Sequence, residues 1–98
     1  MKKSSKSIFC VIAYDIADTK RRNKVIKLIK PYGVRINYSV YECMFTLSQF
    51  ENIKLKISEL ILNNEDNVVY YRVCLNCFSH IIYQPERKTT RKTIVKLE

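Results

Sequence analysis

An acidic residue at the end of an apolar run, followed by a basic segment, is the part of this sequence best suited to chemistry. Asp15 follows seven consecutive apolar residues, and Asp18 comes shortly after it. Asp18 is a good helix N-cap, because its carboxylate can accept hydrogen bonds from the free amides of a first helical turn. The predicted helix then carries six basic residues: Lys20, Arg21, Arg22, Lys24, Lys27 and Lys30.

This combination of side chains matches the groups that recognise a phosphodiester. Arginine binds phosphate bidentately, helix N-terminal amides attract anions, and the carboxylate of Asp15 is a ligand type that suits hydrated Mg²⁺. Arg35, Tyr14 and Tyr41 add a further cation and two aromatic hydroxyls. A two-metal nuclease needs several carboxylates, so a shared metal site would need two copies of Asp15 across a two-fold axis. A turn or capping role for Asp15 is the alternative.

The elements that position these residues in the first third of the chain are a strand and a helix. The uninterrupted apolar run over 8–14 predicts a strand that is buried on both faces, in the middle of a sheet. The following helix ends near Pro31, and we expect Gly33 to take the left-handed conformation of a C-cap. Its apolar stripe at helical spacing consists of Val25, Leu28, Ile29 and Tyr32.

The middle of the chain predicts a hairpin, a second helix and a further strand. The β-rich segments 34–37 and 40–46 are separated only by Tyr38 and Ser39, which indicates a tight turn. Ser48 followed by Glu51 matches a capping box, so a helix is expected to begin there and to end near Asn63 and Asn64. A fourth strand is predicted over 68–75.

The order of these elements predicts the fold class. Strand, helix, strand, strand, helix and strand give an α+β, ferredoxin-like βαββαβ domain over residues 1–78, with a four-stranded antiparallel sheet and both helices on one face. The other sheet face would be bare and apolar, so we expect a homodimer formed through it. Residues 79–98 are expected to form a C-terminal extension, with short strands over Ser79–Gln84 and Thr93–Leu97 that add to a sheet edge of a partner.

The charge of the chain favours a nucleic-acid partner. Eighteen basic and nine acidic residues give a formal net charge of +9, and such a field attracts polyanions. No apolar run approaches the ~20 residues that span a bilayer, and neither helix has the pattern of an interfacial anchor. The N-terminus has no signal-peptide cleavage pattern, so a cytoplasmic protein without a membrane partner is expected.

The four cysteines divide into two kinds. Cys10 and Cys43 lie in predicted strands and are expected to be inert, small apolar side chains. Cys74 and Cys77 form a lone CxxC motif. A zinc site would need two more ligands, and the chain has a single histidine, His80. A dimer could supply a second pair of cysteines, but nothing in the sequence requires it.

Three spaced motifs resemble those of the CRISPR-associated protein 2 family. They are Tyr14-Asp15-Ile16 at the strand end, Arg22-Asn23 in the helix, and the hairpin segment 33–43. The family's own patterns are a YDI strand end, an RRNK-like helix start and a GxRxQYSVFE hairpin, and the match runs from about Ile8 to Cys77. Asn37 replaces the usual Gln and Tyr41 the usual Phe, which keeps the type of chemistry.

The resemblance implies a function in CRISPR adaptation. It implies a homodimer that bridges two dimers of the CRISPR-associated integrase (protein 1) and holds the double-stranded DNA of a new spacer. It also implies Mg²⁺-dependent endonuclease activity on single-stranded RNA or double-stranded DNA, with Asp15 of each subunit as the catalytic metal ligand. Together with the charge pattern, it makes the following residues candidates for nucleic-acid binding: Tyr14, Arg21, Arg22, Lys24, Arg35, Ser39 and Tyr41. The alternatives are a structural DNA-binding scaffold without catalysis and a VapD-like toxin endoribonuclease.

Overall fold

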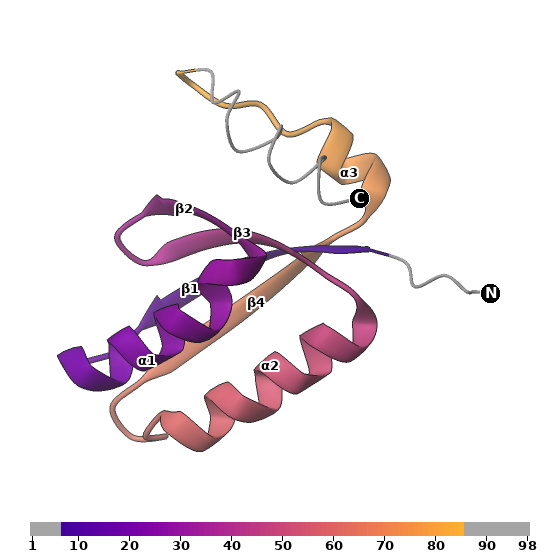
Figure 1. Cartoon of the computed structure of the whole chain (residues 1–98). Helices are drawn as coiled ribbons and strands as arrows, with labels where there is room; N and C mark the ends of the chain where they lie inside the picture. The colour runs from indigo at the N-terminus through magenta and orange to yellow at the C-terminus, as the bar shows by residue number, and fades with distance from the viewer. Residues whose placement is uncertain (1–6, 86–98) are drawn as a thin grey trace.

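A four-stranded antiparallel sheet forms the centre of the molecule. The computed structural model describes residues 7–85. The strands are β1 (Ile8–Asp15), β2 (Gly33–Asn37), β3 (Val40–Phe45) and β4 (Asn67–Val73), in the spatial order β2-β3-β1-β4 (Figure 1). The apolar run that ends at Asp15 is therefore a central strand, paired on both edges, as predicted.

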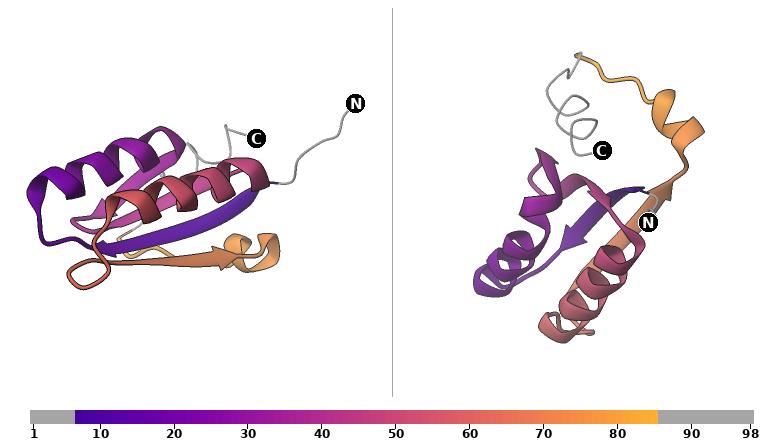
Figure 2. Two further views of the ribbon diagram at one scale, coloured as in Figure 1. Left: turned by 90° about the horizontal axis from the view of Figure 1, so that it is seen from below. Right: turned by 45° about the vertical axis from the view of Figure 1, so that its right-hand side comes forward.

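Two helices cover one face of this sheet. They are α1 (Thr19–Ile29) and α2 (Leu47–Leu60), which lie side by side on the same side of the strands (Figure 2). A short 3-10 turn, η1 (Lys30–Tyr32), connects α1 to β2, and a third helix, α3 (Leu75–Ser79), follows β4. The βαββαβ order with both long helices on one face confirms the prediction from the sequence. Within residues 7–85, no helix combines the length and apolarity needed to cross a bilayer.

Strand β1 contributes side chains to two separate cores, which explains its unbroken apolar sequence. Cys10, Ile12 and Tyr14 belong to the large core beneath α1 and α2. Phe9 points to the opposite face, where it packs with Met44 and with Phe78 of α3. The outer sheet face is therefore covered at this end by the protein's own α3, and the expectation that this whole face is bare is wrong.

Gly33 does not have the backbone conformation expected of it. It is extended, with φ −170° and ψ −160°, and opens β2. Glycine is needed there because a Cβ atom would overlap the carbonyl oxygen of Glu42 and lie 2.7 Å from the Cα atom of Cys43. Gly33 therefore permits a close approach of β2 to β3. It does not cap α1, because the helical segment ends in η1.

The bounds of α2 also differ from those predicted. The capping box is made by Thr46 and Gln49: the Gln49 N–H donates to Thr46 Oγ1 (3.2 Å), and the Thr46 N–H donates to Gln49 Oε1 (2.9 Å). Ser48 lies inside the helix. The helix stops at Leu60, before Asn63, because the Leu62 N–H donates to the Asp66 carboxylate at 2.9 Å and so leaves the helical pattern.

The segment after β4 departs most from expectation. β4 ends at Val73, and the expected strand over Ser79–Gln84 is wrong: Ser79 ends α3, and residues 80–85 form no strand in the part of the chain that is described. The ring of Phe78 lies 4.5 Å from that of Phe9, centroid to centroid, and this contact directs the segment back over the sheet. The expected strand over Thr93–Leu97 lies outside the described residues.

Candidate nucleic-acid-binding pocket and the adjacent carboxylate

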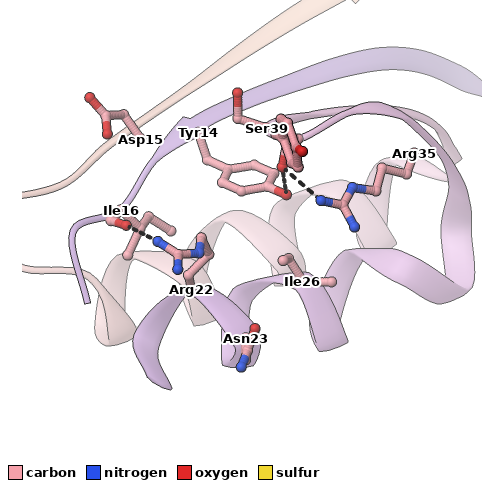
Figure 3. A pocket seen from close by; sticks show the side chains of 9 residues that line it. Tyr14, Asp15, Ile16, Arg22, Asn23, Ile26, Arg35 and Ser39 are labelled. Carbon is pink, nitrogen blue, oxygen red and sulfur yellow. Dashed lines mark hydrogen bonds between the residues drawn. The ribbon is translucent and has the colours of Figure 1, made fainter. Parts of the chain in front are cut away.

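A pocket of about 620 Å³ lies where the end of β1, the first half of α1 and the β2–β3 turn meet (Figure 3). It is formed by elements that are distant in the sequence but adjacent in the fold. Its lining residues are Tyr14, Asp15, Ile16, Arg22, Asn23, Ile26, Arg35, Tyr38 and Ser39.

Tyr14 holds the hairpin turn against the end of β1. Its buried phenol donates a hydrogen bond of 2.9 Å to the carbonyl oxygen of Tyr38, and its backbone N–H donates to the carbonyl oxygen of Ser39 at 3.0 Å. Burial raises the pKa of Tyr14, and the neighbouring Tyr41 raises it further. The phenol is therefore a neutral donor in the physiological range, and it adds no negative charge to the pocket.

Two guanidinium groups flank the Tyr14 ring (Figure 3). Arg22 donates to the carbonyl oxygen of Ile16 (2.9 Å) and to Thr19 Oγ1 (3.1 Å). Arg35 donates to the carbonyl oxygen of Asn37 (3.2 Å). These partners are uncharged, and among residues 7–85 no ion pair involves either arginine. The pocket therefore keeps two positive charges that no protein carboxylate neutralises, as an anion-binding site requires.

Asp15 lies at the rim of this pocket, but its carboxylate points away from the arginines (Figure 3). The cause is the two-residue period of a strand: Tyr14 faces the helices, so its neighbour faces the outer side of the sheet. Asp15 is exposed and is paired in register with Asn67 of β4. The structure thus brings Tyr14, Arg22, Arg35 and Ser39 together, with Asp15 beside them on the opposite face.

Arg21 lies outside the pocket, in an ion pair. Its Nε lies 2.8 Å from Asp66 Oδ2, and its Nη2 lies 3.2 Å from Glu65 Oε1. The Asp66 side chain is buried and also accepts the backbone N–H groups of Ala17 (3.2 Å) and Leu62 (2.9 Å). The hydrogen bonds from Arg21 lower the pKa of Asp66 to about 2. Arg21 therefore helps to fix the loop between β1 and α1 through its ion pair with Asp66, which accepts the Ala17 N–H of that loop.

Two other candidates lie elsewhere. Lys24 lines a separate groove between α1 and α2, together with Lys27 and Lys56. Tyr41 is buried in the large core, with its ring centroid 6.4 Å from that of Tyr14. Tyr41 is not among the residues that line the pocket.

Sequence reasoning missed five residues in this region. Ile16, Asn23, Ile26 and Tyr38 line the pocket, and Asp66 anchors the loop between β1 and α1. Ile26 follows Arg22 by four positions and Asn23 by three on the same helix, so its place beside them was available from helical spacing. Nothing in the polar loop before β4 distinguishes Asp66 from its acidic neighbour, because its burial arises only from the fold.

In the part of the chain that the structure describes, the carboxylate that this site offers to a metal is that of Asp15. Within residues 7–85, no three histidine, cysteine or acidic side chains lie close enough together to hold a metal ion. The Asp15 carboxylate is exposed, and no hydrogen bond or ion pair in the described chain engages it. A single oxygen donor of this kind fits Mg²⁺, which keeps most of its waters and takes one or two carboxylates. The Asp15 carboxylate is therefore a suitable type of ligand for Mg²⁺. One chain supplies one such carboxylate at this site, and a site shared between two chains would have two.

The sequence and the fold both match known proteins. The sequence model of the family described as CRISPR associated protein Cas2 matches residues 8–81. The CRISPR-associated endoribonuclease Cas2 3 of Chloroflexus aurantiacus is 38% identical over 66 residues, which cover 67% of this chain and 71% of the relative. The Cas2 endoribonuclease of Thermus thermophilus is likewise 38% identical over 66 residues, covering 67% and 70% of the two chains.

Solved structures have the same architecture. Streptococcus pyogenes Cas2 superposes with a TM-score of 0.68 at 28% identity, covering 76% of this chain and 96% of that one. A chain of a partial Cas6-RT-Cas1–Cas2 complex has a TM-score of 0.67 at 24% identity, with 84% and 96% covered, and shows the shared fold. The motifs at Tyr14-Asp15, Arg22-Asn23 and the hairpin lie around one pocket in this fold. This chain belongs to the Cas2 family of CRISPR-associated proteins.

Proposed function

We propose that this protein is a cytoplasmic CRISPR adaptation protein that works as a homodimer and binds double-stranded DNA through the pocket of Arg22 and Arg35. In the same proposal, Asp15 of both subunits holds Mg²⁺ and gives the dimer endonuclease activity on RNA or DNA. The observation that carries the proposal is the pocket itself: two uncompensated guanidinium groups lie beside an unengaged carboxylate at the end of one strand.

Phosphate binding follows from the geometry of the two arginines. Each guanidinium has five N–H donors, and the protein uses only a few of them for carbonyl and hydroxyl oxygens. The remaining donors are available to phosphate oxygens. Tyr14 keeps the turn that carries Tyr38 and Ser39 at a fixed distance from Arg22, so the spacing of the two cations does not depend on the ligand.

A second copy of the chain would bring two Asp15 carboxylates together. The register pairs Val11 with Tyr71, Ala13 with Val69 and Asp15 with Asn67. Partners in register point to the same side of a sheet, so Asp15 shares its face with Val69 and Tyr71. These two apolar side chains are 43% and 56% exposed, in contrast to the covered end near Phe9. A two-fold axis through this uncovered area would bury them and place the carboxylates of both subunits near one another.

Mg²⁺ bound by these carboxylates would neutralise charge on the scissile phosphate and activate a water nucleophile. The contributions of the chain itself are positional. Arg22 and Arg35 fix phosphates of the strand, and β1 holds Asp15 one residue beyond Tyr14, so that carboxylate and cations approach the nucleic acid from adjacent sides of the sheet edge.

Partnership with the integrase, CRISPR-associated protein 1, is supported by family membership and by the structural neighbour found in a complex with Cas1. The same family membership favours adaptation over the VapD-like toxin function. A structural scaffold that binds DNA without cutting it is the second candidate. The observation that favours it is the single unengaged carboxylate at this site in each chain, together with the absence of a three-ligand cluster in the described residues.

Cleavage of labelled double-stranded DNA and single-stranded RNA over a Mg²⁺ titration tests the proposal. Asp15→Asn is expected to abolish cleavage and leave DNA affinity little changed. Asp18→Asn is the matched control: it removes one nearby carboxylate charge, and asparagine also caps helices well. Metal-dependent cleavage by wild type and Asp18→Asn, but not by Asp15→Asn, supports the nuclease. Tight binding without cleavage by all three proteins supports the scaffold.

A further inference from the structure

Two cysteines that the proposed function does not use lie at the junction of β4 and α3. Cys74 and Cys77 are exposed and not joined in a disulfide. Cys74 is the N-cap residue of α3, and its sulfur accepts the Cys77 N–H at 3.4 Å. One helical turn of a single chain therefore carries both cysteines, with the Cys74 sulfur held against the backbone of Cys77.

The two thiols differ in acidity. The Cys77 backbone N–H and then the Cys77 thiol lower the pKa of Cys74 by hydrogen bonding to its sulfur. The same contact raises the pKa of Cys77. Cys74 is accordingly the better nucleophile and Cys77 the thiol that resolves a mixed disulfide, which is the division of work in CxxC oxidoreductases.

A hollow of about 300 Å³ lies beside Cys74. Ser7, Ile8, Arg72 and Val73 line it together with Cys74. Arg72 has its guanidinium 5.5 Å from the centre of the Phe50 ring, and among residues 7–85 it forms no ion pair. The hollow thus offers a small molecule one reactive sulfur and one uncompensated positive charge.

A metal site is a poorer fit to the same residues. His80, three positions after Cys77, has its Nδ1 2.8 Å from the carbonyl oxygen of Asn76. No third ligand joins the two cysteines within residues 7–85. Zinc takes four ligands, so the geometry favours the chemistry that two thiols can perform alone.

We propose that Cys74 and Cys77 form a thiol–disulfide exchange site whose substrate is a low-molecular-mass disulfide that carries carboxylates. The Cys74 thiolate attacks one sulfur of the substrate, forms a mixed disulfide and releases one substrate thiolate, which takes up a proton. Cys77 then gives up its proton and attacks Cys74 Sγ, which releases the second substrate thiol. In total, the two thiols of the protein lose two hydrogen atoms and become one disulfide. The small disulfide gains these two hydrogen atoms and becomes two thiols.

The other two cysteines provide an internal contrast. Cys10 and Cys43 lie opposite one another in β1 and β3 and are fully buried. Burial raises the pKa of Cys10 to about 11 and also raises that of Cys43. They are therefore expected to stay reduced under conditions that oxidise the exposed pair.

The first test measures oxidation of the full-length chain by glutathione disulfide, with a chelator present. Alkylation followed by mass spectrometry should find one intrachain disulfide between Cys74 and Cys77, with Cys10 and Cys43 free. Cys77→Ser should accumulate glutathione on Cys74, and Cys74→Ser should lose both products. Far-UV circular dichroism confirms that the variants fold. A pair that stays reduced, a disulfide between two chains, or glutathione trapped on Cys77 in preference to Cys74 would overturn the proposal.

The second test addresses the substrate class. Cystamine is a small disulfide with ammonium groups in place of carboxylates, so it should not benefit from Arg72. Arg72→Gln is expected to slow oxidation by glutathione disulfide several-fold and not to slow oxidation by cystamine, whereas Arg72→Lys should preserve most of the rate. Equal slowing with both disulfides would show that Arg72 only supports the local structure and would refute the stated substrate class. Nuclease assays are independent of both tests, because Val73 pairs with Phe9 at the end of β1 opposite Asp15.

Discussion

Arg21 Nε lies 2.8 Å from Asp66 Oδ2, and this contact joins the first turn of α1 to the residue before β4. The same carboxylate accepts the Ala17 N–H in the loop between β1 and α1. The pair therefore holds the loop that follows Asp15. A residue chosen from the sequence as a nucleic-acid ligand has a structural role in the fold.

Replacing Asp66 with Asn is expected to lower the melting temperature by about 5–10 °C, because a buried acceptor of several hydrogen bonds is lost and Arg21 loses its main partner. Glu65→Gln is the matched control. Glu65 contacts the same guanidinium from a half-exposed position, so its loss should change the melting temperature by less than about 2 °C. Equal effects of the two substitutions would contradict the structural role of Asp66. Thermal denaturation followed by circular dichroism measures both.

Acid should weaken the fold through the same carboxyl group. Its pKa is about 2 in the folded protein and about 3.9 in an unfolded chain. A carboxyl group whose pKa is lowered by folding stabilises the protein fully above its unfolded pKa, and this contribution is lost as the pH falls from about 4 to about 2. The melting temperature of the wild type should therefore fall more steeply over this pH range than that of Asp66→Asn. Parallel curves for the two proteins would show that other groups dominate.

Gly33→Ala tests the close approach of β2 and β3. The added methyl group would meet backbone atoms of Glu42 and Cys43, which cannot move aside as a flexible side chain can. We expect a loss of about 1–3 kcal/mol in the free energy of unfolding, measured by urea denaturation. Asn52→Ala, on the exposed surface of α2, should be close to neutral. A neutral Gly33→Ala would show that the hairpin can separate at no cost.

Arg22→Gln and Arg35→Gln should each weaken DNA binding and reduce the slope of log K against log salt by about 1, since each removes one phosphate contact. Lys24→Gln removes the same charge from α1, but Lys24 lies in another groove, so a smaller effect is expected. Fluorescence anisotropy at several salt concentrations compares the three variants. If all three lose the same affinity and slope, net charge and not the pocket determines binding.

Much of the fold could be predicted from sequence, because its strongest signals are local. The apolar run before Asp15, the Asp18 cap and the helical stripe through Val25 and Ile29 each depend on a few neighbouring residues, and all three agree with the structure. The turn at Tyr38 and Ser39 also agrees. Errors arose where tertiary contacts decide the outcome: the Phe78 ring of α3, a helix that the sequence did not predict, packs on Phe9, and the strand expected over 79–84 does not form.

The candidate site was predictable in part for the same reason. Tyr14, Arg22, Arg35 and Ser39 converge on one pocket, whereas Arg21 and Tyr41 have the same residue types but different surroundings. Arg21 meets a buried carboxylate 45 residues away in sequence, and Tyr41 alternates into the core. No local sequence pattern distinguishes an arginine without a carboxylate partner from one that forms an ion pair with a distant residue of the chain.

The two-residue period of β1 has a consequence for how this chain can vary in length. Tyr14 reaches the helix side and Asp15 the outer side because the strand is held in register on both edges. Inserting or deleting one residue within 9–13 would reverse the facing of the residues on one side of the change relative to those on the other, so that either Tyr14 and Asp15 or Phe9 and Cys10 would exchange faces. Only changes of two residues would leave both faces intact. The number of residues in this strand can therefore change only by an even number if both faces are to be kept. We expect natural variation in length to occur in the segments outside the sheet.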